Sequence, residues 1–396
     1  MAPDISRRHV LLAGATSGVA GTAWYRTIRH RDAHSTEAEP LSTDKSRERP
    51  GNRHNPDPVD VRGAVYIPSR AFNLYQMWDR YDPEVIERDL SYAKRVNLNA
   101  VRTWLCYEVW KDDPEGHEEA LDHFLAAAAD RDISVLLGLF DAIGAEPKPS
   151  RLEDTDPRTA IGLSSPSSIV LLNREKWDET RRFVRWFMDR YRDDERLLGI
   201  ELMNEPGWES IRKSFAEAMF ATAADHRGTV PLTVGSTSLG KNAEYAAWGS
   251  EILQFHYNFA SDRQTFRTML DRVAVLHDAM DSPIWLTEWQ RTRRGRGFTS
   301  APKPSERTPD YASLAPLVHE TGFGNFFWSL MVKPAWIQPQ RSNGVVNGLF
   351  HEDGAVWSLD DARAIQAMSG TSDFEGEVRK RLPAWATPPQ TEGADE

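Results

Sequence analysis

Leu198-Gly-Ile-Glu-Leu-Met-Asn-Glu-Pro206 is the stretch of sequence that decides the fold. This short apolar run stops at Asn204, Glu205 and Pro206, which is typical of a buried strand, because a proline cannot continue a ladder of backbone hydrogen bonds. A second apolar run, Ser282-Pro-Ile-Trp-Leu-Thr-Glu288, also ends in a glutamate. A carboxylate at the tip of a buried strand is costly unless a site uses it, so both glutamates are candidate site residues.

Apolar runs alternate with helical patterns on both sides of these two stretches. The other strands are predicted at 62–67, 99–104, 133–140, 230–234, 251–256 and 324–330. Helices are predicted at 83–96, 118–130, 173–192, 208–225, 264–280, 309–320 and 358–368. Eight strands, mostly separated by helices, predict a parallel sheet closed into a (β/α)8 TIM barrel over residues 61–370. A doubly wound sheet would need a glycine-rich phosphate turn after its first strand, and the sequence has none.

The two ends of the chain differ in composition from the predicted barrel. Ser6-Arg7-Arg8-His9-Val10-Leu11-Leu12 resembles a twin-arginine export signal, and a weakly apolar, small-residue stretch follows it. Residues 1–23 are therefore predicted to be a signal or anchor, with a basic disordered start as the alternative, and the protein to be secreted or held at the cell surface. Residues 24–60 are polar and charged, as in a disordered linker, and residues 371–396 form a polar tail.

The composition excludes several classes of function. The net charge of −11 argues against nucleic acid as a partner. The single cysteine, Cys106, allows no internal disulfide and no cysteine-based metal cluster. His117 and Glu118 begin a pattern similar to a zinc-protease helix, but the second histidine, His123, is out of register with the first. No metal and no cofactor are therefore expected.

The two strand-end glutamates suggest a specific chemistry. In a barrel of this kind, side chains at the carboxyl ends of the strands converge on one face. Cleavage of a glycosidic bond by retaining enzymes uses one carboxyl as a proton donor and a second as the nucleophile, about 5–5.5 Å apart. We expect Glu205 and Glu288 to meet at that spacing across the mouth of the barrel.

Asn204-Glu205-Pro206 after one strand, and Thr287-Glu288 at the end of a later one, resemble clan A of the glycoside hydrolases. The similarity is greatest to family 5, the cellulase and mannanase family, and covers roughly residues 62–370. It implies that Glu205 is the general acid/base, that Glu288 is the nucleophile, and that Asn204 binds the sugar hydroxyl next to the reacting carbon.

The same resemblance implies further substrate-binding residues. Arg102 resembles the family's buried arginine beside the nucleophile, and Trp328 resembles the ring beneath the sugar at the cleavage point. The family usually places a histidine and a tyrosine two residues apart at the end of the sixth strand. His256 and Tyr257 are adjacent here, so a regular strand would point them in opposite directions; we nevertheless expect both near the site.

Other residues are weaker candidates. Asp141 is expected to bind a sugar hydroxyl or to cap the turn that follows it. Arg291-Thr-Arg-Arg-Gly-Arg296 is a solvated loop or a contact for acidic sugars. Six aromatic residues are predicted either to stack on a sugar or to pack in the core, with neither role favoured: Trp104, Tyr107, Trp110, Trp208, Trp289 and Trp336.

The sequence therefore predicts an exported, retaining glycoside hydrolase that cleaves a β-linked glycan of the β-mannan or β-glucan type, similar to an endo-1,4-β-mannanase or a cellulase. An exo-acting β-glycosidase, such as a β-mannosidase or β-glucosidase, is the alternative within enzymes. A pocket blocked by a loop would indicate exo action, and a groove open at both ends would indicate endo action. A carbohydrate-binding protein that has lost catalysis is the alternative outside enzymes.

Overall fold

A computed structural model describes residues 59–386 of the chain, apart from 208–209, 281 and 292–297. The predicted export signal, nearly all of the predicted linker and the last ten residues of the chain lie outside the described residues, as does Trp208. Among the helices that are described, none is both long and apolar enough to cross a membrane.

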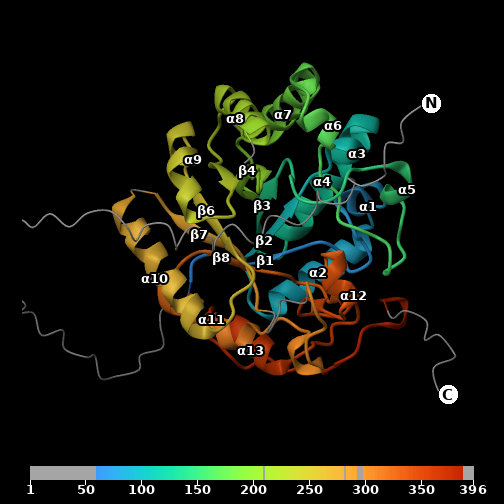
Figure 1. Ribbon diagram of the computed structural model, residues 1–396, viewed down its shortest axis with the longest axis vertical. Coiled ribbons are helices and arrows are strands. Elements are labelled where there is room, and N and C mark those ends of the chain that lie inside the picture. Colours follow the sequence, from blue (N-terminus) through green and yellow to red (C-terminus); the bar gives the residue numbers. More distant parts are fainter. Residues whose placement is uncertain (1–58, 208–209, 281, 292–297, 387–396) are drawn as a thin grey trace, which may run out of the picture. The chain divides into compact units, whose positions relative to one another are not determined.

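Eight strands of the described chain form one parallel sheet (Figure 1). The strands are β1 Arg62–Val65, β2 Ala100–Trp104, β3 Ser134–Gly138, β4 Leu197–Asn204, β5 Leu232–Gly235, β6 Leu253–Tyr257, β7 Ile284–Trp289 and β8 Asn325–Phe327. Their order is β5-β4-β3-β2-β1-β8-β7-β6, and a single parallel bridge from Thr233 to Ile252 joins β5 to the start of β6. The sheet therefore curls into a nearly closed (β/α)8 barrel, which confirms the predicted fold.

Helices lie around these strands, which occupy the centre of the view in Figure 1. The longer ones are α2 Pro83–Arg95, α4 Pro114–Ala129, α7 Trp177–Tyr191, α8 Ser210–Asp225, α10 Arg263–Ala279, α11 Tyr311–Thr321 and α13 Leu359–Ala367. Several begin at an acidic cap: Asp82 accepts from the amides of Glu84 and Val85, and Asp262 accepts from that of Thr265. Such a cap satisfies backbone donors that the first turn of a helix leaves free, so these helices start at defined positions.

The structure also contains elements that the sequence patterns did not predict. They are α1 Leu74–Asp79, α3 Tyr107–Asp112, α5 Pro149–Leu152, α6 Ser168–Leu171, α9 Asn242–Trp248, α12 Gln338–Ser342 and the strand pair β9 Lys333–Pro334 and β10 Val346–Asn347. Each is too short to display a helical or strand period, so periodicity could not reveal it. Most of them follow the carboxyl end of a barrel strand, where sites of this fold are built.

The described part of the predicted polar tail packs against the barrel domain. Phe374 is buried against Phe350, and Val378 forms a bridge with Val356. The indole of Trp385 donates a hydrogen bond to Glu352. Residues 374–386 therefore continue the fold beyond the predicted end of the barrel at residue 370.

Candidate active site

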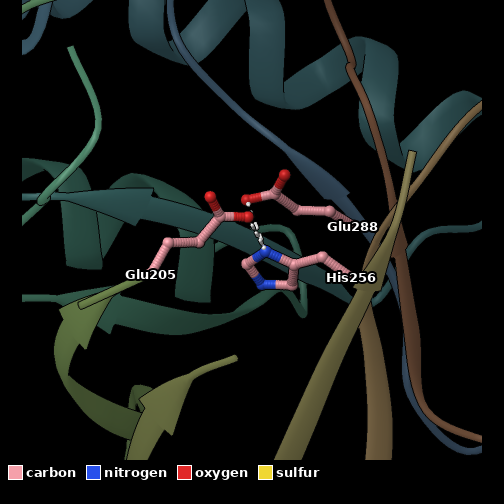
Figure 2. Close-up of side chains that lie close together, drawn as sticks. All are labelled: Glu205, His256 and Glu288. Atoms are coloured by element: carbon pink, nitrogen blue, oxygen red, sulfur yellow. Dashed lines mark hydrogen bonds and ion pairs between the residues drawn. The ribbon is translucent and has the colours of Figure 1, made fainter. Parts of the chain in front are cut away.

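Two glutamates and a histidine meet where β4, β6 and β7 end (Figure 2). Nδ1 of His256 lies 2.6 Å from Oε1 of Glu205 and 3.6 Å from Oε1 of Glu288. One oxygen of each glutamate and a ring nitrogen of His256 all lie within 4.8 Å of one another. The structure thus brings the two glutamates singled out in the sequence to one point at the mouth of the barrel.

The backbone of Glu205 explains how this side chain reaches the mouth. β4 ends at Asn204, and Glu205 adopts a left-handed conformation with φ of 46° while its amide still bonds to the carbonyl of Gly235. Left-handed φ is uncommon for a residue with a side chain, and such residues concentrate at functional sites. The side chain of Glu205 remains 16% exposed, whereas that of Glu288 is 6% exposed.

Arg102, fully buried on β2, connects the nucleophile candidate to the barrel interior. Its Nη1 donates to Oε1 of Glu288 at 2.8 Å, and its Nε and Nη2 each donate to Glu201 at 2.8 Å. Burial would by itself lower the pKa of Arg102, but Glu201 and Glu288 together raise it above its ordinary value. The pKa of Glu201, which burial would raise, is held below its usual range by Arg102. A permanent positive charge therefore lies directly beneath Glu288.

Asn204 and Asp141 extend this network. Oδ1 of Asn204 accepts from Nη2 of Arg102 at 2.9 Å, and its Nδ2 donates to Oδ1 of Asp141 at 2.9 Å. Asp141 also accepts from the amide of Ile143, so it caps the turn after β3. Burial raises the pKa of Asp141 to about 7, and the bond from Asn204 opposes this shift. The amide of Asn204 is thus fixed in one orientation before any ligand binds.

The end of β6 differs from the sequence expectation. The pairing of β6 with β7 shifts register between Phe255 and His256, so that His256 faces Glu288. The ring of Tyr257 instead stacks on Phe266 of α10, with centroids 5.5 Å apart. The expectation that both residues reach the site is corrected here, because consecutive side chains of a strand point to opposite faces.

Asn258 takes the position next to Glu288 and was missed by the sequence analysis. Its Nδ2 donates to Oε2 of Glu288 at 2.7 Å, and its Oδ1 is buried without a partner. Asn258 stands two residues after His256, which is the spacing at which the family carries its tyrosine. That spacing was the signal available in the sequence.

The aromatic candidates separate into two groups. Trp328 follows β8 and is half-buried; its ring lies 6.5 Å from that of Trp104 and 6.2 Å from that of Trp336, and its peptide bond to Ser329 is cis. Trp104 is 2% exposed, and its ring lies against the guanidinium of Arg102 at 4.4 Å while its indole donates to Glu201. Trp104 therefore packs against Arg102 and, at 2% exposed, offers no free face for a sugar.

The remaining aromatic candidates pack elsewhere in the fold. Tyr107 and Trp110 contact Phe183 of α7. Trp289 is fully buried, and its indole donates to Asn325. These contacts agree with the packing interpretation of all three residues.

Within the part of the chain that the structure describes, Glu205, His256 and Glu288 form a group close enough to contact one metal ion. Arg102 already supplies positive charge to Glu288 at 2.8 Å, and His256 Nδ1 is engaged with Glu205. A cation bound by these three groups would have to displace the first contact or lie beside it, so the donor set favours chemistry by carboxylates alone.

One part of the predicted arginine-rich loop can be placed. Arg291 pairs with Asp310 and donates to Ser313, which anchors the loop to the start of α11. The rest of this loop, residues 292–296, lies outside the described residues.

No family model matches this chain, and no curated protein matches its sequence. Solved structures do share its fold. The chain is 17% identical to the exo-β-1,4-mannosidase Op5Man5 from Opitutaceae bacterium strain TAV5, with a TM-score of 0.57, over 78% of this chain and 58% of that one. It is 13% identical to GH5_18 from Streptomyces cattleya, solved in complex with GlcNAc, with a TM-score of 0.56 over 82% and 83% of the two chains.

A third similar structure is an endo-β-1,4-mannanase from Thermotoga petrophila. It is 13% identical, with a TM-score of 0.50, over 79% of this chain and 76% of that one. At these identities the similarity establishes the barrel fold that the chain shares with glycoside hydrolases. The chemistry of the present chain has to be argued from its own residues.

Proposed function

We propose that this protein is a retaining glycoside hydrolase that cleaves β-linked glycans by double displacement. The observation that carries the proposal is the approach of Glu205 and Glu288, whose oxygens come within 4.8 Å of each other at the carboxyl ends of β4 and β7. Inverting enzymes need a wider gap of about 6.5–9.5 Å, because a water molecule has to fit between the sugar and the second carboxylate.

The surroundings of the two glutamates favour different roles for them. Glu288 is nearly buried and receives hydrogen bonds from Arg102 on one oxygen and from Asn258 on the other. Charged and polar donors of this kind stabilise the ionised form, as a nucleophile requires. Glu205 is more exposed and has His256 as its hydrogen-bond partner, so it is free to exchange a proton with the leaving oxygen.

In the first step, a carboxylate oxygen of Glu288 attacks the anomeric carbon. The glycosidic bond breaks, its electron pair passes to the leaving oxygen, and Glu205 gives that oxygen its proton. In the second step, Glu205 takes a proton from water, the water oxygen attacks the anomeric carbon, and the ester bond to Glu288 breaks. Two inversions restore the β configuration.

His256 is suited to hold Glu205 in place through both steps. The 2.6 Å separation allows one hydrogen between Nδ1 and the carboxyl oxygen. We assign that hydrogen to Nδ1, which donates it to Oε1 of Glu205 in both states, while Oε2 of the same carboxyl carries the proton that passes to the leaving oxygen. The bond therefore persists while Glu205 changes from acid to base.

The substrate we propose is a glycan of the β-mannan or β-glucan type. The support is indirect: two of the similar structures are named for β-1,4-mannan cleavage, and one was solved with GlcNAc. Trp328, half-exposed at the end of β8, is the ring that we assign to the floor beneath the reacting sugar. We further propose export by the twin-arginine route, on the motif at residues 6–12.

The test is a screen of wild-type protein on aryl β-glycosides of mannose, glucose and xylose and on the matching polysaccharides. Proton NMR of the first product should show the β anomer before it equilibrates. Glu288→Ala should lose turnover by more than about a thousandfold while it still binds glycan. Glu320→Gln is the matched control and should retain activity, because Glu320 of α11 forms an exposed ion pair with Arg267 of α10.

The screen also separates the alternative functions. A wild-type protein that binds glycans and cleaves none of them would be a carbohydrate-binding protein on the same fold. A first product with inverted configuration would overturn the assignment of Glu288 as nucleophile.

A further inference from the structure

The mouth of the barrel carries an additional structure on the side where β8 ends. Residues 331–350 follow Trp328 and form the strand pair β9 and β10 with α12 between them. We call this stretch the β8 segment. Helices α1, α5 and α12 lie on the same side of the strands in Figure 1.

Hydrogen bonds from side chains of the β8 segment fix it to three other parts of the mouth. Nζ of Lys333 donates to the carbonyls of Pro68 and Ala71, after β1. Arg341 donates to the carbonyls of Pro157 and Ala160, in the long connection after β3. Lys333 and Arg341 are 4% and 9% exposed, so the bonds that they make lie in the interior of the protein. We refer to the β8 segment, held in this way, as the wall.

The third connection reaches the end of β7. Nδ2 of Asn347 donates to Oε1 of Gln290 at 2.8 Å, and its Oδ1 accepts from the amide of Trp336 at 3.1 Å. The segment therefore spans the mouth from β7 past β8 and β1 to the connection of β3.

Trp336 stands at the centre of this wall, directly beside the proposed sugar floor. Its ring meets that of Trp328 nearly edge-on, at 72°, with centroids 6.2 Å apart. Gly162 packs close to the ring, since an added Cβ there would lie 2.6 Å from the indole nitrogen, and Nζ of Lys333 lies 5.5 Å from the ring centroid. Because Trp336 is only 9% exposed, it is packed firmly into the β8 segment, and in the described part of the chain its ring occupies the space on that side of Trp328.

The position of the acid tells which end of a glycan meets this wall. In the sheet order, β4 with Glu205 is four strands away from β8 on one side and, through the β5–β6 bridge, four on the other, so the two strands stand opposite each other. The leaving group must lie near Glu205, since Glu205 protonates it. The sugar on Trp328 then points its non-reducing end toward Trp336.

We infer that this protein acts at chain ends and removes one sugar at a time from the non-reducing end of a β-linked oligosaccharide. The inference rests on the proposed function, because it uses Glu205 and Trp328 in the roles assigned above. Wall contact at Trp336 leaves space for one sugar on the glycone side, while the leaving chain extends past Glu205 toward the short connections after β5 and β6.

The experiment uses the aryl glycoside that the wild-type protein cleaves best, followed by a linear pentasaccharide of the same sugar carrying a fluorophore at its reducing end. Removal from the non-reducing end gives a labelled tetrasaccharide first, then a labelled trisaccharide. If labelled di- and trisaccharides appear before the tetrasaccharide, with full turnover of the aryl glycoside, chain-end action is overturned and glycoside hydrolysis stands. Failure on every aryl glycoside and glycan overturns the proposed function and this inference with it.

A variant tests the wall itself. Trp336→Ala should allow the labelled pentasaccharide to bind with two or more sugars on the glycone side. Shorter labelled products should then form at least several-fold more often relative to the tetrasaccharide. Trp285→Ala is the matched control, because Trp285 is half-buried and lies at the start of β7, away from the mouth. It also packs close to a glycine, since a Cβ added at Gly324 would lie 2.6 Å from its ring. An unchanged product pattern in a folded Trp336→Ala protein, judged by its melting temperature against the control, would contradict the assignment of Trp336 as the barrier.

Discussion

The two sides of the barrel mouth are built differently. On the side of Glu205 and His256, strands return to helices quickly: β4 ends at Asn204 with α8 starting at Ser210, and β6 ends at Tyr257 with α10 starting at Arg263. The connection after β8, the strand that stands opposite β4, is long and contains α12 and the β9–β10 pair. The long connection after β3, with α5 and α6, reaches that side through the bonds from Arg341 to Pro157 and Ala160. The comparison suggests a division of labour in which strand tips fix the reacting groups and long connections fix the extent of the substrate.

Changes at the strand tips should have the largest effects. Glu205→Ala should slow cleavage of substrates with poor leaving groups by about 10²–10⁴-fold, because their oxygen needs a proton in the first step. An aryl glycoside with an acidic phenol should lose far less in that step. Initial rates over a series of substituted phenyl glycosides measure this dependence.

A uniform loss across that series would instead mean that Glu205 does not protonate the leaving oxygen. The wild-type protein, measured with the same glycosides, provides the reference slope. Such an outcome would remove the basis for calling this side of the mouth the leaving-group side.

Asn258→Ala should have the next largest effect. It removes a hydrogen bond to the charged Glu288 in a nearly buried place, a contact of about 1.5–3 kcal/mol, so kcat should fall by roughly 10- to 100-fold with a smaller change in KM. Tyr257→Phe is the neighbouring control, since that ring stacks on α10. Equal losses of kcat in the two variants would contradict the assignment of Asn258, rather than Tyr257, as the residue that stabilises Glu288.

Arg341→Met should affect the wall rather than the chemistry. The change removes this donor from the buried carbonyls of Ala160, Ala335 and Trp336 and should lower the free energy of unfolding by about 2–4 kcal/mol. At a temperature where the variant stays folded, kcat on an aryl glycoside should change less than in Asn258→Ala. Arg267→Met, at an exposed ion pair, is the control.

Denaturant titration gives the stability of each arginine variant, and steady-state kinetics gives its kcat. If kcat fell as much in Arg341→Met as in Asn258→Ala, the wall could not be distinguished from the strand tips by its effect on turnover.

Lys333 should have no direct effect on turnover, and its contribution should be visible in the pH dependence of stability. Burial lowers the pKa of Lys333 to about 7, with Arg341 adding to the shift. Between pH 7 and about 10 the unfolded chain therefore binds more protons at this residue than the folded one, and folding stability rises with pH by at most about 1.4 kcal/mol per unit. In Lys333→Met this contribution is absent.

Melting temperatures of wild type and Lys333→Met should thus diverge in favour of wild type as the pH rises from 7 to 9.5. Lys94→Met, at an exposed pair with Asp132, should track the wild type over the same range. Parallel curves for wild type and Lys333→Met would mean that Lys333 keeps its charge throughout.

The sequence was most informative where a single segment contains its own signal. The run 198–206 predicted β4 to within a few residues of Leu197–Asn204, and the strand-helix alternation predicted the barrel. Glu205 and Glu288 could be singled out because each is a carboxylate that ends an apolar run. These features depend on local pattern, which is what a sequence displays directly.

The features that the sequence did not reveal depend on contacts between distant segments. The wall is held by Arg341 and Ala160, which are 181 positions apart, and by Lys333 and Ala71, which are 262 apart. No periodicity marks such pairs, because each side chain bonds to a carbonyl that every residue possesses. Asn258 is a different case: its spacing of two residues from His256 is visible in the sequence, but its contact with Glu288 joins two segments that are 30 positions apart.

Glu201 has a consequence for the lifetime of the proposed covalent intermediate. When Glu288 becomes an ester, it loses its negative charge, and a guanidinium sealed beneath it would be left without a counterion if it had only that partner. The bidentate contact from Arg102 to Glu201 keeps the buried charge compensated throughout the cycle. The glycosyl-enzyme can therefore form and decay without leaving an uncompensated positive charge in the interior. Nη1 of Arg102 is in place to bond to Glu288 again when the carboxylate is released.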